Sequence, residues 1–209
     1  MLTDQFNRRF TYLRLSITEV CNYRCEYCLP RGYQRGDNVP APLSLEEIGT
    51  LVRAFALSGT RKIRITGGEP TLRKDLPEII ALCKQTPGIR EVVMTSNGSQ
   101  LEKMAEPLAT AGVKRLNISL DSLDPERFKS ITRTGELQQV LDGIEAARAA
   151  GFERIKLNTV VLKGRNHDEV PALTEYALSR GLDITFIEEM PLGEVGRERG
   201  EAYCSSDEV

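Results

Sequence analysis

Short strand-like runs alternate with helix-period stretches along most of this chain, and this alternation constrains its fold more than any other feature. The strand-like runs are Tyr12–Thr18, Lys62–Thr66, Glu91–Thr95, Arg115–Leu120, Arg154–Leu162 and Asp183–Ile187. The helix-period stretches are Ser44–Ser58, Asp75–Lys84, Gln100–Ala111, Leu137–Ala150 and Asp168–Arg180. Strands that alternate with helices predict a parallel α/β sheet. Because six units are fewer than the eight of a closed TIM-like barrel, we expect an open, partial (β/α)6 barrel.

The composition is that of an ordinary globular chain. It has 209 residues, of which 40% are hydrophobic and 28% charged, and its net charge is −2. This length predicts one to two domains. The chain has neither an apolar run that could span a membrane nor the layout of a signal peptide, and its charge gives no reason to expect nucleic acid. Three of the five cysteines are clustered, which argues against a disulfide scaffold and for a reducing cytoplasm.

Cys21, Cys25 and Cys28 form a CxxxCxxC run directly after the first predicted strand. Cysteine thiolates are the usual ligands of iron–sulfur clusters. A cubane needs four ligands, so three cysteines leave one iron open to bind a small molecule, as in catalytic zinc sites. Two alternatives remain, a zinc site with His167 as the fourth ligand and a set of redox thiols. Structural zinc sites usually have two short ligand pairs, which disfavours zinc here.

Polar and apolar residues alternate along at least four of the predicted strands. Parallel strands covered on both faces normally read as continuous apolar runs. Because successive side chains point to opposite faces, an apolar set under the helices leaves the polar set facing the barrel interior. That interior is then lined by Arg14, Arg64, Thr95, Ser119 and Lys156. Its three cations favour an anionic ligand; the alternative is the solvated face of an uncovered sheet.

Gly67, Gly68, Glu69 and Pro70 directly follow the predicted strand Lys62–Thr66. Glycines at a strand end let the backbone approach a ligand closely, and carbonyls and a carboxylate there are suited to an amino group. By itself, this tetrapeptide is equally compatible with a tight turn. Together with the preceding cysteine run, it resembles the radical S-adenosylmethionine (SAM) superfamily.

Further motifs narrow the resemblance. In chain order they are YLRLSIT, CNYRCEYCLP, KIRITGGEPTLR, MTSNG, NISLDSLD, KLNTVV and FIEEMPLGE. Together they resemble the GTP 3′,8-cyclase family (molybdenum cofactor biosynthesis protein A) over nearly the whole chain. The resemblance implies a lyase that converts GTP to 3′,8-cyclo-7,8-dihydro-GTP, with a [4Fe–4S] cluster and SAM as the source of a 5′-deoxyadenosyl radical. It also implies an external electron donor and hand-over of the product to the next enzyme of the pathway.

The same resemblance implies roles for individual residues. Cys21, Cys25 and Cys28 would bind the cluster, Tyr27, Gly68, Ser119 and Met190 would contact SAM, and Arg14, Arg64, Thr95 and Lys156 would contact GTP. It implies no catalytic residue beyond the cluster ligands. Two other functions stay open: a radical SAM enzyme with another anionic substrate, and a non-catalytic metal-binding fragment.

The chain departs from the family at its C-terminal end. The family has three further cysteines for a second [4Fe–4S] cluster, whereas past Cys28 this chain has only Cys83, on an apolar helix stripe, and Cys204, to which we assign no role. Ser205 and Glu208 form a helix N-cap signature at the end of the chain. We therefore expect residues 1–190 to form the barrel and residues 191–209 to begin a truncated region. An exposed apolar patch, self-association as a homodimer and incomplete activity would follow.

Overall fold

The computed structural model describes residues 2–34, 36, 40–190 and 202–209. Its centre is a sheet of six strands: β1 (Tyr12–Ser16), β2 (Lys62–Thr66), β3 (Glu91–Ser96), β4 (Val113–Ser119), β5 (Arg154–Val161) and β6 (Asp183–Glu188). All neighbouring pairs are parallel, and the strands lie in the sheet in chain order. Among these described strands, β1 and β6 do not pair with each other. The barrel is therefore open, as predicted.

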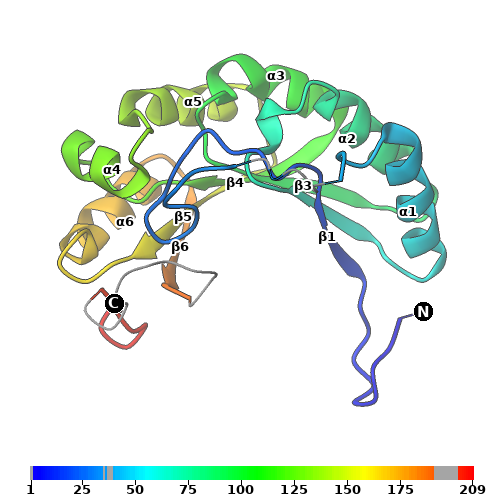
Figure 1. Cartoon of the computed structure of the whole chain (residues 1–209), viewed down its shortest axis with the longest axis horizontal. Coiled ribbons are helices and arrows are strands. Elements are labelled where there is room, and N and C mark those ends of the chain that lie inside the picture. The colour runs from blue at the N-terminus through cyan, green and yellow to red at the C-terminus, as the bar shows by residue number, and fades with distance from the viewer. Residues whose placement is uncertain (1, 35, 37–39, 191–201) are drawn as a thin grey trace.

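Six α-helices lie along the outer, convex side of the curved sheet, as Figure 1 shows. They are α1 (Leu45–Leu57), α2 (Leu76–Gln85), α3 (Leu101–Ala111), α4 (Pro125–Thr132), α5 (Leu137–Ala149) and α6 (Val170–Ser179), with short 3-10 helices η1 (Pro70–Leu72) and η2 (His167–Glu169). The inner, concave side of the sheet carries no helix in the described part of the chain. This arrangement leaves one face of the sheet available for ligands.

The alternation within the strands decides which face is covered. In β2, Ile63 and Ile65 are fully buried under the helices, whereas Arg64 between them is half-buried on the inner face. β4 and β5 repeat this pattern along most of their length. The hydrophobic effect therefore holds the helices on one face and leaves polar side chains on the other, which confirms the predicted orientation.

The helix α4 and the short 3-10 helices are not predicted by the sequence pattern, whereas the strands and the other five α-helices match their predicted ranges to within two residues. α4 is only eight residues long and buries just two large apolar side chains, Phe128 and Ile131, so it is shorter than the window over which a helical pattern is recognised. Its start is nevertheless encoded, because the Asp124 side chain accepts a hydrogen bond from the Arg127 N–H at 2.8 Å and Pro125 occupies the first turn.

The described ends of the chain both lie beside the barrel rather than within it. At the N-terminus, Thr3 and Arg9 form an antiparallel bridge in an arm that projects away from the sheet (Figure 1). Phe6 and Phe10 on this arm are exposed by 70% and 46%. At the C-terminus, an antiparallel bridge joins Leu162, after β5, to Tyr203. Phe6 and Phe10 are two exposed apolar side chains on the arm, and the expected apolar patch stays a prediction.

The N-cap signature at Ser205 and Glu208 forms a hydrogen-bonded turn. The Glu208 side chain accepts a hydrogen bond from the Ser205 N–H at 3.0 Å, and the Glu208 N–H donates to the Ser205 carbonyl at 3.0 Å. The expected domain boundary after residue 190 lies outside the described residues, as do residues 191–201. Of the helices in the described ranges, none is both long and apolar enough to cross a membrane.

Candidate cofactor site

The cysteine loop, residues 21–28, follows β1 at the carboxyl end of the sheet, where barrel active sites lie. Its backbone pairs with the last turn of α4, because the N–H groups of Arg24 and Glu26 donate to the carbonyls of Thr132 and Ile131 at 3.1 and 3.0 Å. The helix that the sequence pattern does not predict therefore supports the loop that the sequence marks most clearly.

The other side of the cysteine loop is tied to the end of β3. The Asn22 side chain donates to the Ser99 hydroxyl at 3.0 Å and accepts from the Asn97 side chain at 2.9 Å. Inside the loop, the buried Tyr23 ring packs edge-on against Phe128 with 6.2 Å between ring centroids. The loop is thus held from both sides by groups distant in the sequence.

The three thiols are free, with Cys21 and Cys25 partly buried and Cys28 exposed. The N–H of Cys28 donates to the Cys25 carbonyl at 3.0 Å, so the loop turns tightly between them. Burial raises the pKa of each thiol. Repulsion from a nearby carboxylate, Glu69 for Cys21 and Asp121 for Cys25, adds to the rise, and so does repulsion from the neighbouring thiolates. A cationic centre is needed to hold all three as thiolates, and its binding would release their protons. This donor set fits an iron–sulfur cluster.

The zinc alternative finds less support in the geometry. Among the described residues, no three His, Cys, Asp or Glu side chains are grouped so as to hold one metal ion. His167 is exposed, and its Nδ1 accepts a hydrogen bond from the Gly164 N–H at 3.0 Å. A cluster makes a different demand, since each cysteine binds a different iron atom.

Gly67 and Gly68 bring the end of β2 against the chain that leads into the cysteine loop. A Cβ atom on Gly67 would lie 2.5 Å from the Thr18 carbonyl oxygen, and one on Gly68 would lie 2.4 Å from the Val20 carbonyl oxygen. The Gly68 N–H donates to the Thr18 carbonyl at 2.8 Å. The glycines thus allow close approach of two protein segments beside Cys21; a contact between Gly68 and SAM stays a prediction.

Glu69 joins the ends of β2 and β3. Its carboxylate is 1% exposed and accepts hydrogen bonds from Thr71, from the Ser96 hydroxyl at 2.9 Å and from the Asn97 N–H at 2.6 Å. Burial raises the pKa of Glu69, and these hydrogen bonds oppose that rise. The carboxylate is therefore occupied within the protein. The suggestion that it holds an amino group of a ligand has no support from this arrangement.

The other predicted SAM contacts lie at the same end of the sheet. The Tyr27 hydroxyl donates to the Asp121 carboxylate at 2.7 Å, just past β4. Ser119 is the half-buried last residue of β4, two positions before that carboxylate. Met190 follows β6 and is 57% exposed. Tyr27, Ser119 and Gly68 thus come from segments that the fold brings to one edge.

The predicted GTP contacts lie on the inner face of the sheet. Arg14 and Arg64 are register partners on β1 and β2, and Arg64 donates to the Thr95 hydroxyl at 3.0 Å. Thr95 is aligned through Asn117 with Lys156, two strands away, at roughly 10 Å for the ordinary strand spacing. Arg14 is exposed and the others are half-buried, so they form a concave surface open to solvent.

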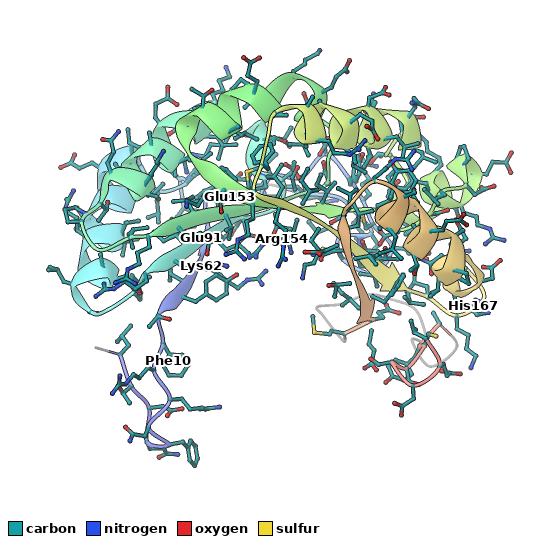
Figure 2. The ribbon with its side chains drawn as sticks, turned by 180° about the vertical axis from the view of Figure 1, so that it is seen from behind. Phe10, Lys62, Glu91, Glu153, Arg154 and His167 are labelled. Atoms are coloured by element: carbon teal, nitrogen blue, oxygen red, sulfur yellow. The ribbon has the colours of Figure 1, made fainter. Side chains whose placement is uncertain are left out.

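Some of the cations on this inner face form ion pairs with carboxylates, and others do not. Lys62 and Glu91, which Figure 2 shows on the concave side, form an ion pair at 3.0 Å, and Arg154 pairs with Asp183 at 3.1 Å. By contrast, no carboxylate in the described ranges pairs with any of the three predicted GTP-binding cations, Arg14, Arg64 and Lys156. Unpaired cations on a concave surface attract anions.

The family model of the radical SAM superfamily matches residues 15–177, which span the end of β1, the cysteine loop, the Gly67–Gly68 turn and the four strands β2 to β5. The chain belongs to the radical SAM superfamily. A [4Fe–4S] cluster and SAM are the cofactors of radical SAM proteins, and Cys21, Cys25 and Cys28 are the residues of this chain that fit the cluster.

Curated relatives within the superfamily are similar over the whole chain. GTP 3′,8-cyclase 1 of Pseudomonas aeruginosa is 59% identical over 209 residues, covering 99% of this chain and 62% of its own length. GTP 3′,8-cyclase of Marinobacter nauticus is 55% identical over 213 residues, covering 100% of this chain and 63% of its own length. The chain therefore spans less than two thirds of the length of these relatives.

Several solved structures share the fold of this chain at low sequence identity. HydG, a maturase of the [FeFe]-hydrogenase, gives a TM-score of 0.75 at 17% identity, over 94% of this chain and 46% of HydG. Streptococcus suis SuiB bound to S-adenosylmethionine gives 0.74 at 17% identity, over 87% of this chain and 41% of SuiB. These similarities confirm the partial barrel.

Some residues of the site carry little signal in the sequence. Asp121 and Asn166 are 2% and 0% exposed, and both lie within the polar framework around Tyr27. Asp121 lies in the motif NISLDSLD, so the sequence places it after the fourth strand but does not reveal its hydrogen bond with Tyr27. Asn166 lies in a polar turn that reads as solvated. Their partners are far away in the sequence, so no local pattern reveals them.

Proposed function

We propose that this chain is the SAM- and cluster-binding part of a GTP 3′,8-cyclase, which converts GTP to 3′,8-cyclo-7,8-dihydro-GTP in molybdenum cofactor biosynthesis. The observation that carries the proposal is the 59% identity to the Pseudomonas aeruginosa enzyme over almost the whole chain. Further support comes from the cysteine loop and from a concave face whose three cations, Arg14, Arg64 and Lys156, pair with no carboxylate in the part of the chain that the structure describes.

At the cofactor side, we assign the cluster to Cys21, Cys25 and Cys28 and SAM to Tyr27, Gly68, Ser119 and Met190. Support for the first three SAM contacts comes from their common position at the carboxyl edge of the sheet, next to the cysteine loop. Together, cluster and SAM supply a 5′-deoxyadenosyl radical. The protein's own task is to hold the reactants within reacting distance and to exclude other hydrogen donors.

At the substrate side, we assign GTP to Arg14, Arg64, Thr95 and Lys156. Guanidinium and ammonium groups are the usual partners of phosphate oxygens. Arg64 is held by the Tyr12 hydroxyl and by Thr95, which fixes its direction without neutralising it. The cations would hold the triphosphate while the nucleoside lies toward the cysteine loop.

The curated relatives are longer than this chain, which spans 62% of the length of the Pseudomonas aeruginosa enzyme. We propose that residues 1–190 form the barrel unit, that residues 191–209 begin the following region, and that the chain alone cleaves SAM without completing the cyclisation. In the parent enzyme, an external electron donor would reduce the cluster and the product would pass to the next enzyme.

We place the protein in the cytoplasm. The exposed Phe6 and Phe10 support self-association as a homodimer.

Reductive SAM cleavage by the anaerobically reconstituted chain tests the proposal. We expect 5′-deoxyadenosine by mass spectrometry, and its loss in the Cys25→Ala variant. GTP should compete with other nucleoside triphosphates for binding and bind more tightly than they do. Two results would contradict the proposal: no deoxyadenosine from a chain with its full content of cluster, or equal affinity for GTP, ATP, CTP and UTP.

A further inference from the structure

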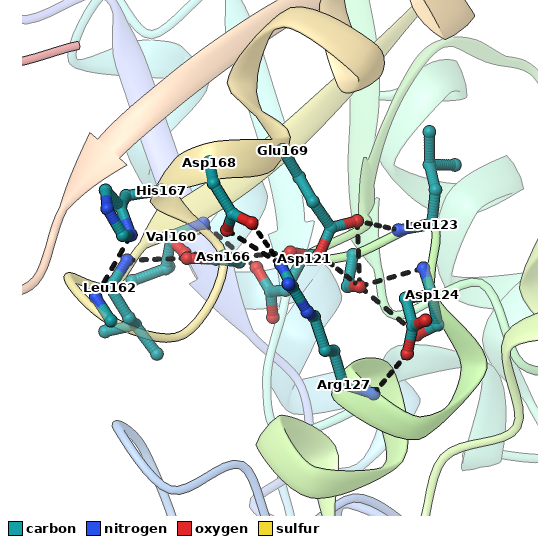
Figure 3. Close-up of polar contacts among 12 residues, drawn as sticks. Asp121, Leu123, Asp124, Arg127, Val160, Leu162, Asn166, His167, Asp168 and Glu169 are labelled. Atoms are coloured by element: carbon teal, nitrogen blue, oxygen red, sulfur yellow. Dashed lines mark hydrogen bonds and ion pairs between the residues drawn. The ribbon is translucent and has the colours of Figure 1, made fainter.

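Asn166, just before η2, is a fully buried side chain that uses its donor and acceptor atoms on three backbone groups. Its Nδ2 donates to the Asp121 carbonyl at 2.7 Å and to the Val160 carbonyl at 2.9 Å, and its Oδ1 accepts from the Leu162 N–H at 2.7 Å (Figure 3). These contacts lock the segment after β4 to the end of β5. The network is joined to the cysteine loop through the hydrogen bond between Tyr27 and Asp121.

Asp121 links this network to the cysteine loop. Its side chain accepts hydrogen bonds from the Val160 N–H at 2.9 Å and from the Tyr27 hydroxyl at 2.7 Å. Its backbone is held by Asn166, so neither its main chain nor its carboxylate is free to rotate. The direction of the Tyr27 ring is therefore set by a carboxylate that is itself fixed on both sides.

Two further contacts from the same segment reach the loop or its support. Arg165 donates to the Glu26 carboxylate within the loop at 2.9 Å. The Glu169 carboxylate accepts from the Ser122 hydroxyl at 2.8 Å and from the Leu123 N–H at 2.8 Å, just before α4 (Figure 3). Residues 165–169 thus act on the cysteine loop directly, through Asp121 and through α4.

We propose that Asp121 is a positioning residue that holds Tyr27, and with it the SAM side of the cysteine loop, in its binding arrangement, and that Asn166 fixes Asp121 for this purpose. This inference rests on the proposed cluster and SAM site and assigns it a supporting layer of residues. Burying the Asp121 carboxylate costs hydration free energy, and an apolar side chain of similar size would fill the same space without this loss. The carboxylate instead fixes the orientation of the Tyr27 side chain, because it accepts a short hydrogen bond from the Tyr27 hydroxyl.

A double-mutant cycle of Tyr27→Phe and Asp121→Asn tests the proposal, because Tyr27→Phe removes only the hydroxyl and Asp121→Asn keeps the side-chain shape. Each variant is loaded anaerobically, and SAM binding is measured by the change that SAM produces in the electron paramagnetic resonance spectrum of the reduced cluster. We expect Tyr27→Phe to bind SAM about tenfold more weakly, as for one lost hydrogen bond to a charged group. Asp121→Asn, which replaces the charged acceptor with a neutral amide, should also weaken SAM binding, and the double variant should bind no more weakly than Tyr27→Phe.

Ser44→Ala provides a destabilised control, because it removes the capping box of α1 without touching this network. It should leave SAM binding unchanged. Unchanged SAM affinity in both single variants, or fully additive losses in the double variant, would overturn the positioning role. An equal loss in Ser44→Ala would also overturn it, since destabilisation alone would then explain the effect.

A second readout does not depend on the cluster. In metal-free protein, hydrogen–deuterium exchange at the amides of Arg24, Glu26 and Cys28 should be about tenfold faster in Asp121→Asn and in Asn166→Ala than in the wild type and in Ser44→Ala. Equal exchange rates would refute the positioning role. Failure of the wild type to load a cluster would refute the proposed function alone, because the exchange experiment would still decide whether Asp121 holds the loop.

Discussion

Replacing Asp121 with Asn is expected to change how the stability of the fold depends on pH. Burial raises the pKa of the Asp121 carboxyl from 3.8 to about 6, hydrogen bonds from Tyr27 and Val160 oppose the rise, and repulsion from Glu26 adds to it. Between these two pKa values the folded protein holds the proton more tightly than the unfolded chain. The free energy of unfolding therefore falls as the pH rises through this window.

The size of this effect follows from the two pKa values. Their difference corresponds to about 3 kcal/mol in total, of which about 1.4 kcal/mol falls between pH 5 and pH 8. Asn carries no ionisable group, so the stability of Asp121→Asn relative to the wild type should rise by about 1.4 kcal/mol over this range. In urea unfolding followed by circular dichroism, this is a relative midpoint shift of about 0.5 M.

Asp142→Asn serves as the control, since Asp142 is an exposed aspartate that accepts a hydrogen bond from Gln138. Its stability relative to the wild type should not change with pH in the same way. An equal difference between Asp121→Asn and the wild type at pH 5 and pH 8 would show that burial does not raise the pKa of the Asp121 carboxyl.

Three further substitutions test separate parts of the structure. Gly68→Ala places a Cβ 2.4 Å from the Val20 carbonyl oxygen, so it should lower the free energy of unfolding by about 1–3 kcal/mol and reduce the iron content after reconstitution. Lys156→Met should weaken GTP binding in isothermal titration by about tenfold, whereas Lys114→Met, which removes an exposed, ion-paired lysine, should not. Asp124→Ala removes the N-cap of α4 and should cost about 1 kcal/mol in urea unfolding, with Asp124→Asn close to the wild type.

Each of these expectations has a contrary result. Normal stability and iron loading in Gly68→Ala would mean that the close approach of the two segments is not needed. Equal GTP binding in Lys156→Met and Lys114→Met would remove Lys156 from the substrate site. A stability loss in Asp124→Asn as large as in Asp124→Ala would show that the side-chain cap is not the cause.

The sequence predicts the fold well because the signals that define it are local. Alternation such as Ile63, Arg64, Ile65 assigns each side chain of a strand to a face without reference to any distant residue. The three cysteines likewise lie within one loop, so their spacing alone indicates a common ligand. Both predictions depend on positions separated by only a few residues.

The supporting contacts of the site are not predicted, because they join residues far apart in the chain. Tyr27 and Asp121 are 94 positions apart, and Asn166 lies 45 positions beyond Asp121. For Glu69, the sequence correctly places the residue after β2. It does not show that the Glu69 carboxylate accepts hydrogen bonds from Ser96 and Asn97 within the protein. Such pairings arise from the topology of the sheet rather than from local sequence pattern.

The supports of the cysteine loop also set an order of events during synthesis. The loop leaves the ribosome early, but its partners emerge much later: Asn97 after β3, Ile131 and Thr132 in α4, and finally Arg165 after β5. A growing chain that ends before residue 165 lacks part of this framework, and contacts of such long sequence separation form late in folding. A cluster bound by the three cysteines would therefore be inserted after residue 165 has left the ribosome, and the thiols would need protection from oxidation until that point.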